Sequence, residues 1–313
     1  MNWTLALPEI VLALSGLVIL LAGVMQKRGQ AFFSCTMMTL FALVVTAALV
    51  VLSPDGTGYS HVFINDGFAR FMKVLALAGA ALSLVLGIGY AREMEIDKFE
   101  FPVLVLFSTL GAMIMASSGN LMTLFVGLEL SSLSIYILCA FARDQVTAAE
   151  AGLKYFVLGS LASGILLYGI SLAYGFAGTL DYAGLQQAVR GSAVLPAGLM
   201  VGIVFVLVGL CFKLSMVPFH MWTPDVYQGA PTSVTAYMAG APKIAAFAVL
   251  LRVMAGPFSS MAHQWQLLIE VVSAASMVFG ALAAIPQGNI KRLMAYSSIG
   301  HMGYAMIGLA AGT

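Results

Sequence analysis

A few ionisable side chains lie inside long apolar runs or directly at their ends, where charged residues are rare. These are Glu129 in LFVGLELSSLSIYIL, Lys154 in AGLKYFVLG, Lys213 in GLCFKLSMVPF, His220 in PFHMWTP and Lys243 in AGAPKIAAF. A charge at the centre of a bilayer costs about 2.5 to 3.5 kcal/mol on insertion scales, so these side chains must face protein or water. Carboxylate, amine and imidazole groups in such places are typical of proton relays.

The chemistry that we expect is a change in lysine protonation controlled by an acid. Burial disfavours a charged lysine and a neighbouring carboxylate favours it, so a carboxylate that moves can make the lysine take up or release a proton. One interior acid, Glu129, stands against three interior lysines, so one-to-one pairing cannot satisfy all of them. The alternative interpretation is that the charges form structural ion pairs, with Lys154 reaching from a helix end to the membrane surface.

Pro218 predicts that the helix carrying Lys213 is broken, because proline removes a backbone donor and clashes with the preceding turn. A broken helix at membrane depth is tolerated only where it is buried in protein or lines a hydrated cavity, and such breaks recur at the ion sites of transporters. His220 follows the break. Its imidazole either passes protons between the lysines and water or forms hydrogen bonds at the membrane surface beside Trp222.

The elements that must position these residues are membrane-spanning helices. Of the 313 residues, 61% are hydrophobic and 9% are charged, which excludes an ordinary soluble domain. A bilayer core ~30 Å thick needs about 20 apolar residues per helix. Ten runs meet this condition: Leu7–Met25, Ala31–Leu52, Phe71–Tyr90, Phe101–Ser117, Leu121–Ala142, Ala151–Ala177, Leu195–Phe219, Thr232–Ala255, Gln266–Ile285 and Ile290–Ala311. The predicted fold is therefore an all-α polytopic helix bundle of about ten transmembrane helices, the seventh of them broken.

The charges in the connections predict the orientation of the bundle. With the N-terminus outside, the cytoplasmic side would hold Lys27, Arg28, Arg92, Lys98, Arg143, Lys291 and Arg292, and the outer side Arg70 with Lys73 nearby, Arg190, and Arg252 at a helix end. This bias follows the positive-inside rule and predicts a periplasmic N-terminus. Glu9 inside the first run, with basic residues after it, argues against a cleaved signal peptide.

Several other classes of function are excluded by the sequence. Lys and Arg number 14 against 13 Asp and Glu, so there is no basic surface for nucleic acid. Nothing resembles a Walker loop or a dinucleotide fingerprint, so we expect no binding of ATP or NADH. The three cysteines lie in separate apolar runs, which indicates neither a disulfide framework nor a metal site.

Three stretches together carry a family resemblance: FKLSMVPFHMWTPDVYQGAPTSVTAYMAGAPK, LKYFVLGSLASGILLYG and NIKRLMAYSSIGHMGYAMIGLA. The chain resembles, over essentially its whole length, the subunit N family of the bacterial proton-pumping NADH:quinone oxidoreductases (respiratory complex I), whose antiporter-like subunits are related to multisubunit cation/proton antiporters. The resemblance implies that Glu129, Lys154, Lys213, His220 and Lys243 form a proton relay, a half-channel with part of a central hydrophilic axis. It also implies that FMN, iron–sulfur clusters and quinone belong to partner subunits and that this chain holds no cofactor.

The resemblance further implies about fourteen spans in two inverted repeats, whereas the sequence stops after its tenth run. We therefore expect N-terminal helices over 1–120 and an antiporter-like domain over 121–313 whose second repeat is incomplete. The expected location is the bacterial inner membrane, with the other complex I subunits and lipid as partners. Two alternative functions share the same charged residues, a sodium/proton antiporter subunit and a structural membrane scaffold with paired charges.

Overall fold

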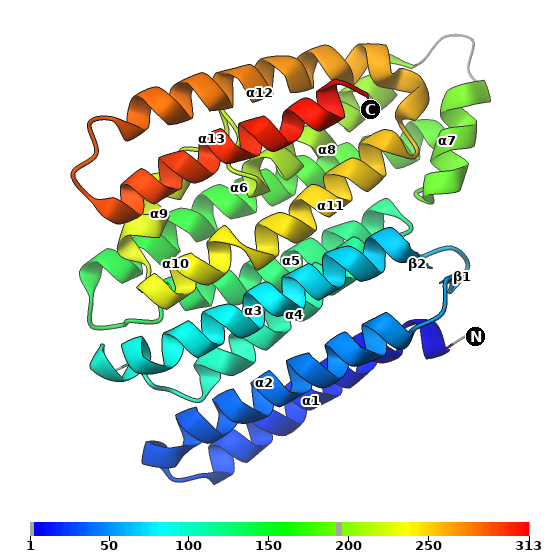
Figure 1. Cartoon of the computed structure of the whole chain (residues 1–313). Helices are drawn as coiled ribbons and strands as arrows, with labels where there is room; N and C mark the ends of the chain where they lie inside the picture. Colours follow the sequence, from blue (N-terminus) through cyan, green and yellow to red (C-terminus); the bar gives the residue numbers. More distant parts are fainter. Residues whose placement is uncertain (1–2, 95, 192–195, 313) are drawn as a thin grey trace. The chain divides into compact units, whose positions relative to one another are not determined.

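A computed structural model describes residues 3–94, 96–191 and 196–312, and the side chains of residues 28 and 29 are not described. The helices are α1 (Leu7–Met25), α2 (Arg28–Leu52), α3 (Gly67–Glu93), α4 (Glu100–Ala116), α5 (Leu121–Cys139), α6 (Val146–Ala177), α7 (Tyr182–Gly191), α8 (Ala197–Lys213), α9 (Thr223–Gly229), α10 (Thr232–Ala239), α11 (Ala241–Ala255), α12 (Ala262–Ala284) and α13 (Ile290–Ala310), with 3-10 turns η1 (Trp3–Leu5) and η2 (Ser259–Met261) (Figure 1). Each of the ten predicted spans contains at least one helix among its described residues. Leu195, the predicted start of the seventh span, lies outside them.

Length and composition support a membrane protein. Within the described ranges, seven helical segments are long and apolar enough to cross a membrane, and α4 and α8 are shorter apolar helices of 17 residues each. A helix of 17 residues is about 25 Å long, the lower limit for a bilayer core. In α8 the shortness follows from the break, since the rest of this predicted span is not helical.

The seventh span does break, but the helix ends before Pro218. The last helical residue of α8 is Lys213, and Ser215 adopts a left-handed conformation with φ 62°. The backbone N–H of Ser215 donates to the carbonyl of Phe212 and that of Met216 to the carbonyl of Cys211, at 3.0 and 2.9 Å. This is the Schellman pattern that closes a helix C-terminus. Pro218 therefore lies inside the irregular segment, five residues after a helix that backbone hydrogen bonds have already closed.

The eighth span has a second break that we did not predict. The run Thr232–Ala255 divides at Gly240 into α10 and α11. Pro242 is the second residue of α11, where a missing N–H costs nothing, but its ring excludes a continuous helix because it would meet the carbonyl four residues earlier. The backbone N–H of Lys243 donates to the carbonyl of Gly240 at 3.1 Å. Lys243 thus lies in the first turn after a break.

The connections contain small elements of their own. The loop after α2 holds a hairpin of β1 (Gly56–Gly58) and β2 (Phe63–Asn65), and the loop after α6 holds the amphipathic helix α7. Arg70 pairs with Asp55 at 2.7 Å beside the hairpin. These elements make the two longest connections structured.

The described chain forms two compact units that share some helices. One consists of residues 1–119, 123–153 and 229–248, and in it α1, α2, α3 and α4 pack against one another and α10 packs against α3. In the same unit an added Cβ at Gly111 would lie 2.5 Å from the backbone nitrogen of Ser131, so only glycine permits this contact of α4 with α5. The other consists of residues 120–122, 154–228 and 249–313, in which α12 and α13 lie side by side (Figure 1).

Contacts within each unit agree with helices that alternate in direction. In the first unit Glu9 near the start of α1 pairs with Lys73 near the start of α3, so two odd-numbered spans begin at the same end. In the second unit Lys154 near the start of α6 and Arg292 near the start of α13 both pair with Asp225, in the connection between the predicted seventh and eighth spans. In each unit the paired residues come from helix ends that the predicted alternation places on one side of the membrane.

Candidate functional site

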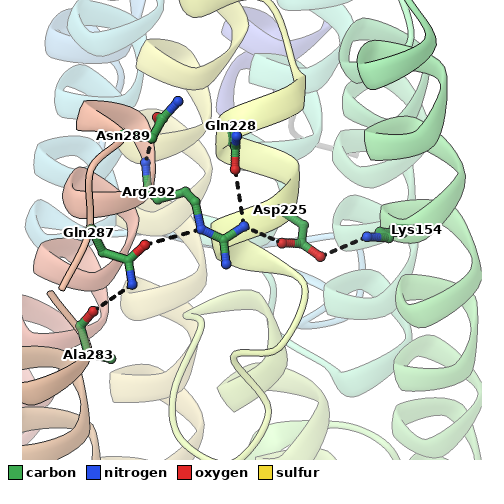
Figure 2. A network of polar contacts seen from close by, with 7 residues as sticks. All are labelled: Lys154, Asp225, Gln228, Ala283, Gln287, Asn289 and Arg292. Atoms are coloured by element: carbon green, nitrogen blue, oxygen red, sulfur yellow. Dashed lines mark hydrogen bonds and ion pairs between the residues drawn. The ribbon is translucent and has the colours of Figure 1, made fainter.

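One carboxylate joins three helices of the second unit. Asp225 on α9 accepts a hydrogen bond from Lys154 Nζ of α6 at 2.8 Å and one from Arg292 Nη1 of α13 at 2.6 Å (Figure 2). Arg292 Nη1 also donates to Gln228 Oε1 at 3.1 Å, and its Nε donates to Gln287 Oε1 at 3.3 Å. We call Lys154, Asp225 and Arg292 the charge clamp.

The start of α13 positions the guanidinium of the clamp. Asn289 is the N-cap of α13, and its side-chain oxygen accepts from the backbone N–H groups of Lys291 and Arg292 at 2.9 and 3.3 Å. Gln287 donates from Nε2 to the carbonyl of Ala283 at 2.8 Å while its oxygen holds Arg292. The N-cap stabilises the start of α13 by about 1 kcal/mol. Together with the bonds of Gln287 it holds the turn before α13, and so Arg292, in place.

The clamp is half exposed, and this limits its strength. The side chains of Lys154, Asp225 and Arg292 are 42%, 38% and 29% exposed. The hydrogen bond from Lys154, followed by the bond from Arg292 and the charges of both, holds the pKa of Asp225 below its ordinary value. Because the folded-state pKa is lowered, the stabilisation is present above the ordinary carboxyl range and is lost as the pH falls through the lowered value.

Replacing Asp225 with asparagine is therefore expected to lower the thermal stability of the purified protein slightly at neutral pH and not in acid. Partly exposed pairs contribute up to ~1 kcal/mol each, so the loss should be about 1 to 2 kcal/mol at most. The difference from the wild type should persist at mildly acidic pH and disappear only below the lowered pKa of Asp225, where the carboxyl of the wild type is as uncharged as the amide of the variant. Melting curves over a series of pH values from 7 downward measure this. Glu270→Gln on the exposed surface of α12 is the control, and an equal loss at every pH would contradict the assigned charge pairing.

Lys213 lies at the end of α8 against an aromatic group. Its Nζ is 5.3 Å from the centroid of the Tyr155 ring on α6. Tyr155 stacks on Trp222, with centroids 4.3 Å apart and an angle of 14° between the rings. Trp222 Nε1 donates to the carbonyl of Phe212 at 3.0 Å, one of the carbonyls at the end of α8. Lys213 before the break and Trp222 after it therefore both contact Tyr155 of α6.

The other predicted relay residues are placed as follows. Glu129 is half-buried in the middle of α5, and Lys243 is 3% exposed in the first turn of α11, both in the first unit. His220 lies half-buried in the irregular segment of the second unit, its ring 4.6 Å from that of Phe279 on α12. Lys213 contacts Tyr155, the residue that follows Lys154 on α6. The control of lysine protonation by Glu129 stays a prediction.

Sequence reasoning missed the acid and the arginine of the charge clamp. Asp225 was part of a quoted motif without a role, and Arg292 counted only as a loop charge. A signal existed, because both lie beside predicted helix ends on the same side of the membrane and have opposite charge. Among the described residues, no group of three or more His, Cys, Asp or Glu side chains could hold a metal ion.

A buried ion pair in the first unit was also missed. Lys73 Nζ lies 2.6 Å from Glu9 Oε1, with the two side chains 0% and 8% exposed. The lysine nitrogen also lies 4.8 Å from the centroid of the Phe63 ring on β2. A desolvated pair of this kind is costly to form and far more costly to break on one side only.

Apolar helices broken beside lysines, with further charges paired between helix ends, define the class as an antiporter-like polytopic membrane protein. Comparison with known proteins agrees. The family described as NADH:quinone oxidoreductase/Mrp antiporter, transmembrane, matches residues 118–313. NADH-quinone oxidoreductase subunit N of Gluconacetobacter diazotrophicus is 73% identical over 100% of this chain and 66% of the relative, and that of Granulibacter bethesdensis is 59% identical over the same shares.

Solved structures give the same result. A chain of respiratory complex I from Thermus thermophilus with bound Aureothin has a TM-score of 0.80 and 36% identity, over 96% of this chain and 64% of that chain. A chain of the Mrp complex from Dietzia sp. DQ12-45-1b has a TM-score of 0.81 and 25% identity, over 99% and 59%. The chain belongs to the NADH:quinone oxidoreductase/Mrp antiporter family, and the resemblance to its subunit N members and the antiporter-like fold are confirmed. It spans about two thirds of the length of the curated relatives that it matches.

Proposed function

We propose that this chain is a membrane-arm subunit of a proton-translocating NADH:quinone oxidoreductase and moves protons across the membrane when other subunits transfer electrons from NADH to quinone. The observation that carries the proposal is the 73% identity to a subunit N across the whole chain, with lysines beside both helix breaks. As a subunit of a translocase the chain performs no redox chemistry itself. FMN, the iron–sulfur clusters and quinone belong to its partners.

The proposed relay consists of Glu129, Lys154, Lys213, His220 and Lys243. Protons move along such a relay when the charge on one member changes the proton affinity of the next. The two breaks support this role, because the end of α8 and the start of α11 bring polar backbone beside lysines at a depth where water is scarce. The charge clamp supports a fixed place for Lys154 at one end of the relay.

The proposed setting is the bacterial inner membrane, with neighbouring antiporter-like and small membrane subunits as partners. The decisive experiment is affinity purification of the tagged chain from its native membranes, followed by a pumping assay in vesicles. We expect flavin and iron–sulfur subunits to co-purify and NADH to drive proton uptake. Purification without redox subunits would overturn the proposal.

A sodium/proton antiporter subunit is the second candidate, favoured by the TM-score of 0.81 to a chain of the Mrp complex. It predicts sodium-dependent proton movement in vesicles that lack every NADH-oxidising subunit. Proton movement that needs NADH and ignores sodium would exclude this candidate. A purely structural scaffold predicts instead that neutral side chains at Glu129 and Lys213 leave pumping intact.

The proposed orientation has the N-terminus and the loop with the hairpin in the periplasm. Single cysteines at Thr57 and Lys98, both exposed, are then expected to react with an impermeant thiol reagent from opposite sides of the membrane. Glu95, in the same connection as Lys98, lies outside the described residues. The three native cysteines are buried and give a low background. Labelling of Thr57 in right-side-out spheroplasts and of Lys98 only in inverted vesicles is the expected result, and the reverse pattern would contradict the orientation.

A further inference from the structure

We propose that Tyr155 is a positioning residue for Lys213, and that its ring, held in place by Trp222, stabilises the protonated amine during proton transfer. This inference rests on the proposed function, because it assigns Tyr155 a task in the same relay. Tyr155 is not one of the predicted relay residues. It follows Lys154 directly in the sequence.

The geometry fits a cation–π contact. The Lys213 Nζ lies 5.3 Å from the centroid of the Tyr155 ring, inside the ~6 Å range of this interaction. Tyr155 is 3% exposed, so water competes little for the amine on the side of the ring. A protonated amine is attracted to the negative face of a ring, whereas a neutral amine is not.

The ring is held rigidly in this position. Trp222 stacks on Tyr155 at 4.3 Å and is 2% exposed. Its indole is fixed at one edge by the hydrogen bond to the Phe212 carbonyl, and the ring of Phe212 lies 5.6 Å from it. The ring of Tyr227 packs against the indole in an edge-to-face arrangement, with the ring centroids 6.3 Å apart. Because the Tyr155 ring is already fixed, its stabilisation of the protonated Lys213 amine is not reduced by an entropy cost of ordering the ring.

The location also links the two lysines of the proposed relay that lie in the second unit, Lys154 and Lys213. Adjacent residues of a helix point about 100° apart, so one turn of α6 presents Lys154 to Asp225 and Tyr155 to Lys213. The charge clamp fixes α6 to α9, and the stack fixes α6 to the segment before α9. Tyr155 therefore contacts a residue on each side of the break, Lys213 before it and Trp222 after it.

The experiment separates the charge of the ring from its bulk. Phenylalanine and its mono-, di- and trifluorinated forms are incorporated at position 155, because fluorine weakens the negative face of the ring with little change in size. Tyr155→Phe should retain most NADH-driven pumping. Pumping per NADH oxidised should then fall stepwise with fluorine number, by a total of about two- to thirty-fold, the range expected for a cation–π contact. Tyr155→Leu should fall at least as far.

The same fluorinated series at Tyr168 is the matched control, because this ring lies on the same helix and meets Phe205 at 5.9 Å. It should leave pumping unchanged. Equal pumping across the series at position 155, with normal pumping by the wild type, would overturn the role of Tyr155 while leaving the proposed function intact. Absence of NADH-driven pumping in the wild type would overturn the proposed function instead.

Discussion

Replacing Lys213 with arginine is expected to reduce NADH-driven proton pumping as strongly as replacing it with alanine, by at least about tenfold. A proton carrier must release its proton in every cycle, and a guanidinium with a pKa above ~12 hardly does so. A structural cation, in contrast, would keep its role in the arginine variant, because the charge is retained. Lys213 also lies at the Schellman end of α8, where either cation is favourable beside the helix terminus.

The measurement is proton uptake per NADH oxidised by inverted vesicles, with subunit content checked in parallel. Arg252, at the end of α11, supplies a control, because Arg252→Lys exchanges the same two cations at a position outside the proposed relay. Glu129→Gln should also impair pumping, and Glu129→Asp less so. Near-normal pumping by Lys213→Arg in a fully assembled complex would show that the lysine is not a carrier.

Replacing Lys73 with methionine is expected to destabilise the protein by about 3 to 5 kcal/mol, the largest stability change that we predict. The substitution leaves the Glu9 carboxylate uncompensated at a site where its side chain is 8% exposed. Adding Glu9→Leu should recover most of the loss, because a buried pair exchanged for apolar groups is often close to neutral.

Thermal unfolding of the purified protein in detergent or nanodiscs measures the stability of the single variant and of the double variant. Lys98→Met, which removes an exposed lysine of the same unit, should change the melting temperature little. If the single and double variants melted at the same temperature, the two side chains would not form the pair that the structure shows. If Lys73→Met melted like the wild type, Glu9 would have to be uncharged in the folded protein.

The sequence by itself determined the class of the molecule and the course of its helices. The first span begins and ends where predicted, at Leu7 and Met25, because the length of an apolar run and the cost of unpaired backbone in lipid are local properties. The resemblance to the family was also readable from the sequence. The break after Lys213 was predicted from Pro218, although the helix ends earlier, since the left-handed turn at Ser215 has no proline or glycine to announce it.

The break at Gly240 was missed because Gly-Ala-Pro inside an apolar run changes neither its length nor its mean hydropathy. Its signal was Pro242, which cannot follow three helical residues without a clash. The same reasoning that was applied to the seventh span would have found it. Spans predicted from the length and hydropathy of apolar runs cannot show a break of one residue, because such a break changes neither quantity.

Only the tertiary structure decided which charges meet. Asp225 pairs with residues 71 and 67 positions away in the sequence, and Glu9 pairs with a lysine that was counted with the loop charges. Such pairs depend on which helix ends become neighbours and on how each helix is rotated about its axis. Hydropathy gives the order of the spans, but packing between helices sets their rotation, and this in turn placed Tyr155 beside Lys213.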